Sequence, residues 1–95
     1  MAIARVVTFD GVSAGRMDEI RAQMQEGERP EDLPATEILA LHDPDGEKAV
    51  VLLFFDNEDD YRRGDEVLDA MPSSDTPGQR SSVTRYDVAV RMTAD

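Results

Sequence analysis

A run of seven apolar residues, from Ala49 to Phe55, constrains the fold of this 95-residue chain more than any other feature. Its β-branched and aromatic residues favour a strand, and it is far shorter than the roughly 20 residues of a membrane-spanning helix. A strand with one face in water alternates apolar and polar side chains. Here each face carries three large apolar side chains, which are Val51, Leu53 and Phe55 on one and Val50, Leu52 and Phe54 on the other. Both faces therefore need cover.

Turn and helix-end signals around this strand predict the order β-α-β-β-α-β. Asp10-Gly11 and the span Asp43–Gly46 are turn sequences, and Gly27 and Pro72 are helix stops. Ser13 is expected to begin the first helix, and Asp56 or Asn57 the second. The predicted strands cover residues 2–9, 35–42, 47–55 and 82–92.

This order predicts one α+β domain over residues 1–95. By analogy we expect a ferredoxin-like fold, with a four-stranded antiparallel sheet, strands one and three in the centre, and both helices on one face. The other face would then be open in a single copy. Burying each large apolar side chain of the third strand contributes about 1.5–3 kcal/mol. We therefore expect a homodimer formed through the open sheet face.

Two pairings follow from this arrangement. The hairpin register predicts that His42, lying opposite Glu47, shares a face with Ala40, Ile38, Ala49 and Val51. In the last strand, the apolar parity of Tyr86, Val88, Val90 and Met92 is expected to meet the helices. Arg5 and Asp87 would then form a cross-strand ion pair near the partner copy.

The charge of the chain excludes several classes of protein. A net charge of −11, with no basic patch, predicts that the protein does not bind nucleic acid. It has no cysteine, and its N-terminus lacks the basic and apolar regions of a signal peptide. No segment is long enough to cross a membrane. We expect a cytoplasmic protein that binds neither membranes nor nucleic acid.

The apolar third strand runs into Phe54-Phe55-Asp56-Asn57-Glu58-Asp59-Asp60-Tyr61, an acidic helix start followed by an amphipathic helix. With this pattern the chain resembles the dimeric α+β barrel superfamily, and within it the antibiotic-biosynthesis-monooxygenase-like proteins. It also looks like small uncharacterised actinobacterial proteins. The resemblance implies a cavity between sheet and helices, and it includes cofactor-free oxygenases, haem-degrading enzymes, isomerases and proteins without known activity. This chain lacks the tryptophan that the oxygenases commonly use and a histidine in the second helix for haem, so no cofactor is expected.

Five residues are candidates for handling a ligand. His42 is the only histidine and could perform acid–base chemistry, although a solvated hairpin tip explains it as well. Tyr61 and Tyr86 could direct hydroxyl groups into a cavity, and core packing is the simpler interpretation of both. Met17 and Met24 would form an adaptable wall for a ligand or simply pack in the core.

Other motifs point to no chemistry. The acidic stretch from Asp56 to Asp60 does not match a calcium-binding loop, and no metal site is expected. The segment from Asp10 to Arg16 faintly resembles an acylphosphatase loop but lacks its full signature. No residue set specifies a reaction. The hypotheses are therefore a protein that binds a small apolar or aromatic molecule between sheet and helices, a cofactor-independent monooxygenase-like enzyme, a non-catalytic dimerisation module and, more weakly, a phosphate-ester hydrolase.

Overall fold

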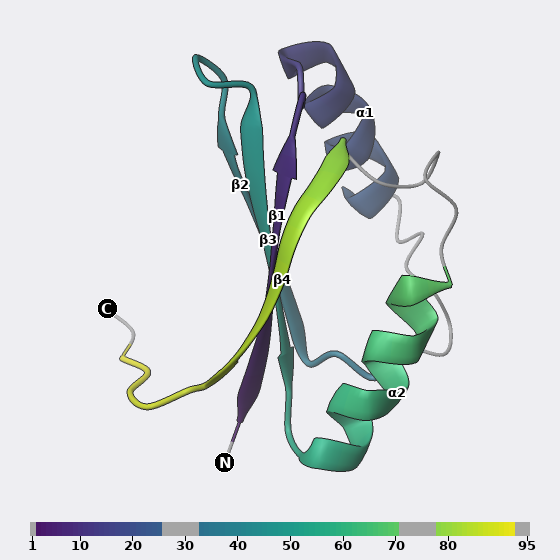
Figure 1. The fold of residues 1–95 in the computed structure, drawn as a ribbon, viewed down its shortest axis with the longest axis vertical. Helices are drawn as coiled ribbons and strands as arrows, with labels where there is room; N and C mark the ends of the chain where they lie inside the picture. Colours follow the sequence, from purple (N-terminus) through teal and green to yellow (C-terminus); the bar gives the residue numbers. More distant parts are fainter. Residues whose placement is uncertain (1, 26–32, 71–77, 93–95) are drawn as a thin grey trace.

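The computed structural model describes residues 2–25, 33–70 and 78–92. Along the chain the elements are β1 (Ile3–Asp10), α1 (Ala14–Gln25), β2 (Glu37–Asp43), β3 (Lys48–Phe55), α2 (Glu58–Asp69) and β4 (Gln79–Asp87). The strands form one antiparallel sheet in the order β2-β3-β1-β4. Both helices lie on the same side of this sheet (Figure 1). The predicted ferredoxin-like α+β fold is confirmed, with β1 and β3 in the centre.

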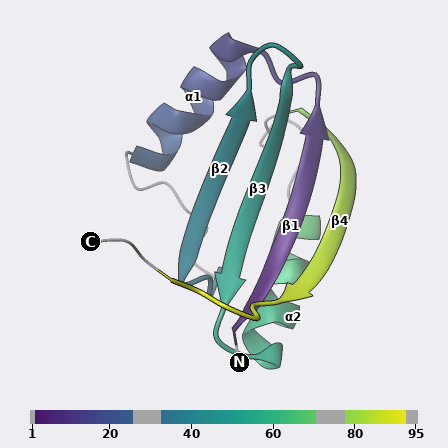
Figure 2. The ribbon, with the colours of Figure 1, turned by 90° about the vertical axis from the view of Figure 1, so that its left-hand side faces the viewer.

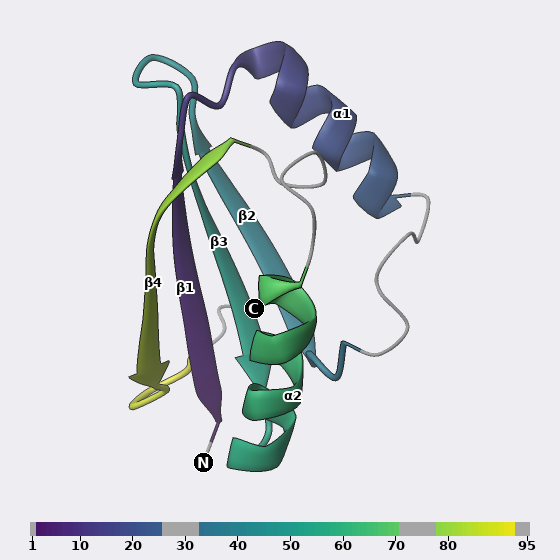
Figure 3. The same cartoon turned by 45° about the vertical axis from the view of Figure 1, so that its right-hand side comes forward.

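Buried side chains between the sheet and the helices form two clusters. One lies beneath α1 and consists of Val7, Phe9, Val12, Met17 and Ala49. The other lies beneath α2 and consists of Leu33, Ala35, Leu53 and Phe55. The partly buried Val51 packs against both. The two helices thus cover different halves of the sheet, as Figure 3 shows.

Both helices begin where the sequence predicts. The Ser13 hydroxyl accepts a hydrogen bond from the Arg16 N–H at 3.1 Å, which satisfies one of the free donors of the first turn of α1. Asn57, rather than Asp56, caps α2, and its side-chain oxygen accepts from the Asp60 N–H at 2.8 Å. The predicted stops at Gly27 and Pro72 lie outside the described residues.

The β2–β3 hairpin confirms the predicted faces but not the predicted register. Ile38, Ala40 and His42 lie opposite Leu53, Val51 and Ala49, respectively. The prediction that His42 lies opposite Glu47 is wrong, because Asp43 still pairs with Lys48 and the loop covers 44–47. Glu47 has a φ of 53°, a left-handed conformation that ends the loop rather than extending the strand. The shift of two residues preserves which side chains share a face.

The predicted pairing of β4 is wrong in two respects. Arg5 lies opposite Arg85, and Asp87 lies opposite Ile3, so no Arg5–Asp87 pair is formed. The faces are also reversed, because Arg5 points toward α2 and binds two of its carboxylates. Tyr86 lies opposite Ala4 on the side away from the helices and is 57% exposed. The strand ends at Asp87, and Val90 and Met92 beyond it are exposed.

The segment that follows β4 crosses one end of the open sheet face toward β2 (Figure 2). The Val88 N–H donates to the Ala2 carbonyl oxygen at 2.9 Å, which continues the pairing past β4. Further along, the Arg91 guanidinium forms an ion pair with Glu37 and lies 4.8 Å from the centre of the Phe54 ring. The segment therefore connects the two edge strands. Among the described residues, neither helix has the length and apolar character needed to span a membrane.

A close approach between α2 and β3 gives a first testable prediction. A Cβ atom at Gly64 would lie 2.4 Å from Cε1 of the buried Phe55 ring, so Gly64→Ala should destabilise the fold by about 1–3 kcal/mol through overpacking. The matched control is Gly15→Ala in α1, where a Cβ atom meets nothing within 4 Å and alanine favours the helix by about 0.5–1 kcal/mol. Urea denaturation measures both changes. Equal stability of the two variants would contradict the close packing of α2 on Phe55.

Candidate functional site

A recess of about 440 Å³ lies between α1 and the edge strand β2. Helix α1 contributes Met17, Ile20, Arg21 and Gln25, and β2 contributes Ala40 and His42. The helical residues share one face because they recur at spacings of three and four positions. Ala40 and His42 share the helix-facing side of β2 because they are two positions apart.

The most deeply buried side chains that line the recess are apolar, and they form its base. Met17 is buried in the cluster under α1, and Ile20 packs partly buried against the same cluster. Arg21 and Gln25 are exposed, and the Arg21 guanidinium lies 3.4 Å from a carboxylate oxygen of Asp18. Among the residues that the structure describes, none of those lining the recess is acidic. The recess therefore combines an apolar base with neutral and cationic polar groups.

His42 is held in this recess by the backbone of the β1–α1 connection. Its Nε2 lies 3.0 Å from the carbonyl oxygen of Val12. Val12 is itself fully buried, and its N–H donates to the carbonyl oxygen of Glu47 at 2.7 Å. Through its N–H and its carbonyl oxygen, Val12 thus links the β1–α1 connection to the hairpin at two residues, Glu47 and His42. The imidazole is half-buried, so its interpretation as a solvated hairpin tip is wrong.

The five predicted ligand residues do not form one site. The recess brings Met17 and His42 together. Met24 belongs to α1, and its side chain lies outside the described part of the structure. Tyr61 lies under the other helix, α2, and Tyr86 lies on the open face. The expectation that Tyr86 lies in the core is wrong, because β4 presents the opposite parity to the helices.

Tyr61 has the packing role that the simpler interpretation predicts. Its ring meets Phe55 edge-on at 5.6 Å, with an angle of 80° between the ring planes, and the Arg85 guanidinium lies 5.1 Å from its centre. Burial raises the pKa of the Tyr61 hydroxyl above its ordinary value, and the charge of Asp65 adds to this rise. The phenol stays protonated at neutral pH. The hydrogen bond from Arg85 lowers the pKa of Glu58.

The recess residues that sequence reasoning missed are Ile20, Arg21, Gln25 and Ala40. Ile20 and Arg21 lie three and four positions after Met17, so helical periodicity predicts that they share the same face of the helix. Ala40 lies two positions before His42 in β2, so the alternation of side chains along the strand also predicts that it faces α1. What the sequence could not show is that α1 lies against the β2 edge, since that depends on tertiary packing.

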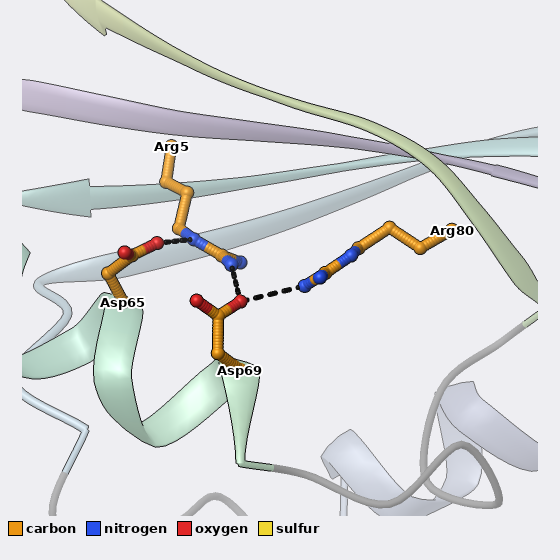
Figure 4. Close-up of polar contacts among 4 residues, drawn as sticks. All are labelled: Arg5, Asp65, Asp69 and Arg80. Atoms are coloured by element: carbon orange, nitrogen blue, oxygen red, sulfur yellow. Dashed lines mark hydrogen bonds and ion pairs between the residues drawn. The ribbon is translucent and has the colours of Figure 1, made fainter.

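A buried arginine forms the densest polar network of the described structure. Arg5 is 2% exposed, and its Nε lies 2.9 Å from Asp65 Oδ1 and its Nη2 3.2 Å from Asp69 Oδ1 (Figure 4). Asp69 Oδ1 also lies 2.9 Å from Nη1 of Arg80 at the start of β4. Asp65 and Asp69 are four positions apart on α2, so both face the sheet. The network attaches α2 to β1 and β4 and contains no free catalytic group.

The remaining candidate chemistries gain no support. Within residues 2–25, 33–70 and 78–92, no group of three or more His, Cys, Asp or Glu side chains could hold a metal ion. In the segment from Asp10 to Arg16, the Val12 N–H donates to Glu47 and the Arg16 N–H donates to Ser13. Two backbone donors that an acylphosphatase-like loop would direct at a phosphate are therefore already used within the protein.

The Arg5 network predicts an order of stabilities. The double variant Asp65→Asn, Asp69→Asn leaves a buried guanidinium without a carboxylate and should lose about 3–5 kcal/mol of unfolding free energy. Arg5→Met should cost less, because Met fills the space and both carboxylates can be hydrated. Combining all three substitutions should recover part of the loss. Glu66→Gln, at an exposed position of α2, is the control and should change stability by less than about 0.5 kcal/mol. Additive effects in denaturation experiments would contradict the coupling.

No protein-family model matches the sequence, and no curated protein is significantly similar to it.

Proposed function

We propose that this protein binds a small apolar or aromatic molecule in the recess between α1 and β2. The observation that carries the proposal is the composition of that recess, with Met17 and Ile20 at its base and His42 in its wall. Ligand pockets typically measure about 300–1,000 Å³ and combine apolar walls with a few polar groups that orient the ligand. The recess, at about 440 Å³, has both properties. The unbranched side chain of Met17 can adapt its shape to a ligand.

We further propose that two copies associate through the open sheet face, as the resemblance to dimeric α+β barrels implies. The strand registers give the middle of this face uncharged side chains, which are Ala4, Val6, Thr8, Leu39, Leu41, Val50, Leu52, Phe54, Ser82, Thr84 and Tyr86. The charged side chains of the same parity, Glu37, Asp10, Asp43 and Lys48, lie at the two ends of the face.

The size of this face supports the same proposal. Four strands spaced by about 4.8 Å and seven residues rising by about 3.3 Å each span roughly 19 by 23 Å. Soluble monomers rarely expose apolar patches larger than a few hundred Å², and larger ones mark interaction sites. In a chain with a net charge of −11, the uncharged middle of this face is where two identical copies repel least. A cytoplasmic location remains part of this proposal.

Binding in the recess can be measured with 2-methoxynaphthalene as a fluorescent probe. The protein has no tryptophan, so the probe can be excited at wavelengths that its two tyrosines do not absorb. We expect micromolar binding that Ala40→Phe weakens about tenfold, because the new ring fills the recess. Ala22→Phe adds the same ring to an exposed position of α1 and should leave binding unchanged. Loss of affinity in both variants, or in neither, would count against the recess.

Assembly through the open face can be measured by light scattering. We expect a particle of twice the chain mass of 10.5 kDa at micromolar concentration. Leu52 lies on the open face and Leu53 on the helix face, so Leu52→Asp should yield a folded monomer by placing a charge in the interface. Ala22→Asp, on the exposed side of α1, should remain dimeric. A wild-type monomer with intact circular dichroism would refute the dimer but would not affect the recess.

A further inference from the structure

We propose that the ligand of the recess carries a hydrogen-bond donor, a hydroxyl or a ring N–H, which binds Nδ1 of His42. This inference rests on the proposed function and adds the chemical class of the ligand. It follows from how the fold fixes the proton of this imidazole and from which nitrogen remains accessible. The apolar base of the recess does not by itself require a donor, because it would also accept a molecule with no polar group.

The Val12 carbonyl determines which nitrogen of His42 carries the proton. A carbonyl oxygen can only accept a hydrogen bond, so the contact of 3.0 Å requires a proton on Nε2. In the neutral imidazole, Nδ1 is then an acceptor with a free lone pair. The Val12 N–H is itself hydrogen-bonded to the Glu47 carbonyl oxygen, so the ring is oriented by main chain that is anchored to the hairpin.

The acceptor nitrogen is accessible from outside the protein. In the described part of the chain, Nδ1 has no protein partner, whereas every buried side-chain nitrogen or oxygen atom there has one. Since Nδ1 has none and the residue is half-buried, this atom reaches the surface rather than lying in the core. His42 lines the recess together with Met17 and Ile20, so a ligand seated on those side chains lies beside the imidazole.

An apolar ligand without a donor would displace water from Nδ1 and leave the acceptor unpaired. A buried polar group without a partner is costly, and sites built to bond a hydroxyl or N–H therefore discriminate strongly against analogues that lack it. The other polar groups of the recess do not replace this contact. Arg21 is a donor only and is paired with Asp18, and Gln25 is exposed, so water can satisfy its amide without a ligand. His42 is therefore the group that selects the ligand.

The experiment compares 2-naphthol with 2-methoxynaphthalene, which have the same ring system and differ in the donor hydroxyl. Fluorescence titration at neutral pH should show that wild-type protein binds 2-naphthol about tenfold more tightly. His42→Phe should remove this preference while both probes still bind. Ala22→Phe, the exposed control of α1, should retain it.

A spectroscopic measurement tests the same inference without a substitution. His42 is the only histidine, so ¹⁵N spectra of histidine-labelled protein contain one pair of ring nitrogens. In the free protein with a neutral imidazole, we expect the proton on Nε2 and a lone pair on Nδ1. 2-Naphthol should shift the Nδ1 resonance, and 2-methoxynaphthalene should not.

The outcomes separate this inference from the proposed function. A proton on Nδ1 in the free protein, or equal binding of both probes with no change at Nδ1, would overturn the role of His42 and leave the recess as a binding site. Failure of both probes to bind would refute the proposed function, and this inference with it.

Discussion

The pairing of Arg5 with Asp65 and Asp69 determines which face of the sheet the helices cover. An arginine that is 2% exposed cannot stay in the core without carboxylates, and α2 supplies two of them one helical turn apart. Once Arg5 points toward α2, its strand parity places Ile3, Val7 and Phe9 on the same side. The opposite parity of β1, with Ala4, Val6 and Thr8, then belongs to the open face. One charged side chain thus orients the central strand, and the strand orients the sheet.

Different interactions hold the two helices against the sheet. Helix α2 is fixed by the Arg5 network, by the Asn57 cap and by the contact of Gly64 with Phe55. Among the α1 side chains that the structure describes, Met17 is buried, and the segment before the helix is tied to the hairpin through Val12. The recess lies beside α1, whose described contacts with the sheet are the apolar packing of Met17 and Ile20.

The sequence predicted the order of the elements because the turn and cap residues act locally. Ser13, Asn57 and the hairpin turn each fix an element boundary within a few residues. The faces of β1 and β4 were predicted incorrectly because both parities of these strands are partly apolar. Only a contact between distant segments, from Arg5 to residues 65 and 69, decides between them. For the recess, the sequence predicted His42 and Met17 as candidate ligand residues. It did not predict that they lie together, because that depends on where α1 packs on the sheet.

The central position of β1 has a consequence for synthesis of the chain. Both strands that pair with β1 come much later, since Val6 lies opposite Leu52 on one side and Thr84 on the other. Contacts between distant segments slow folding, because a long loop must close before any of them forms. As the chain emerges from the ribosome, β1 therefore has no strand to pair with until β3 has been synthesised. Its other edge stays unpaired until β4 has been synthesised. During that interval the first strand made is the one most exposed to chaperones and to pairing with other chains.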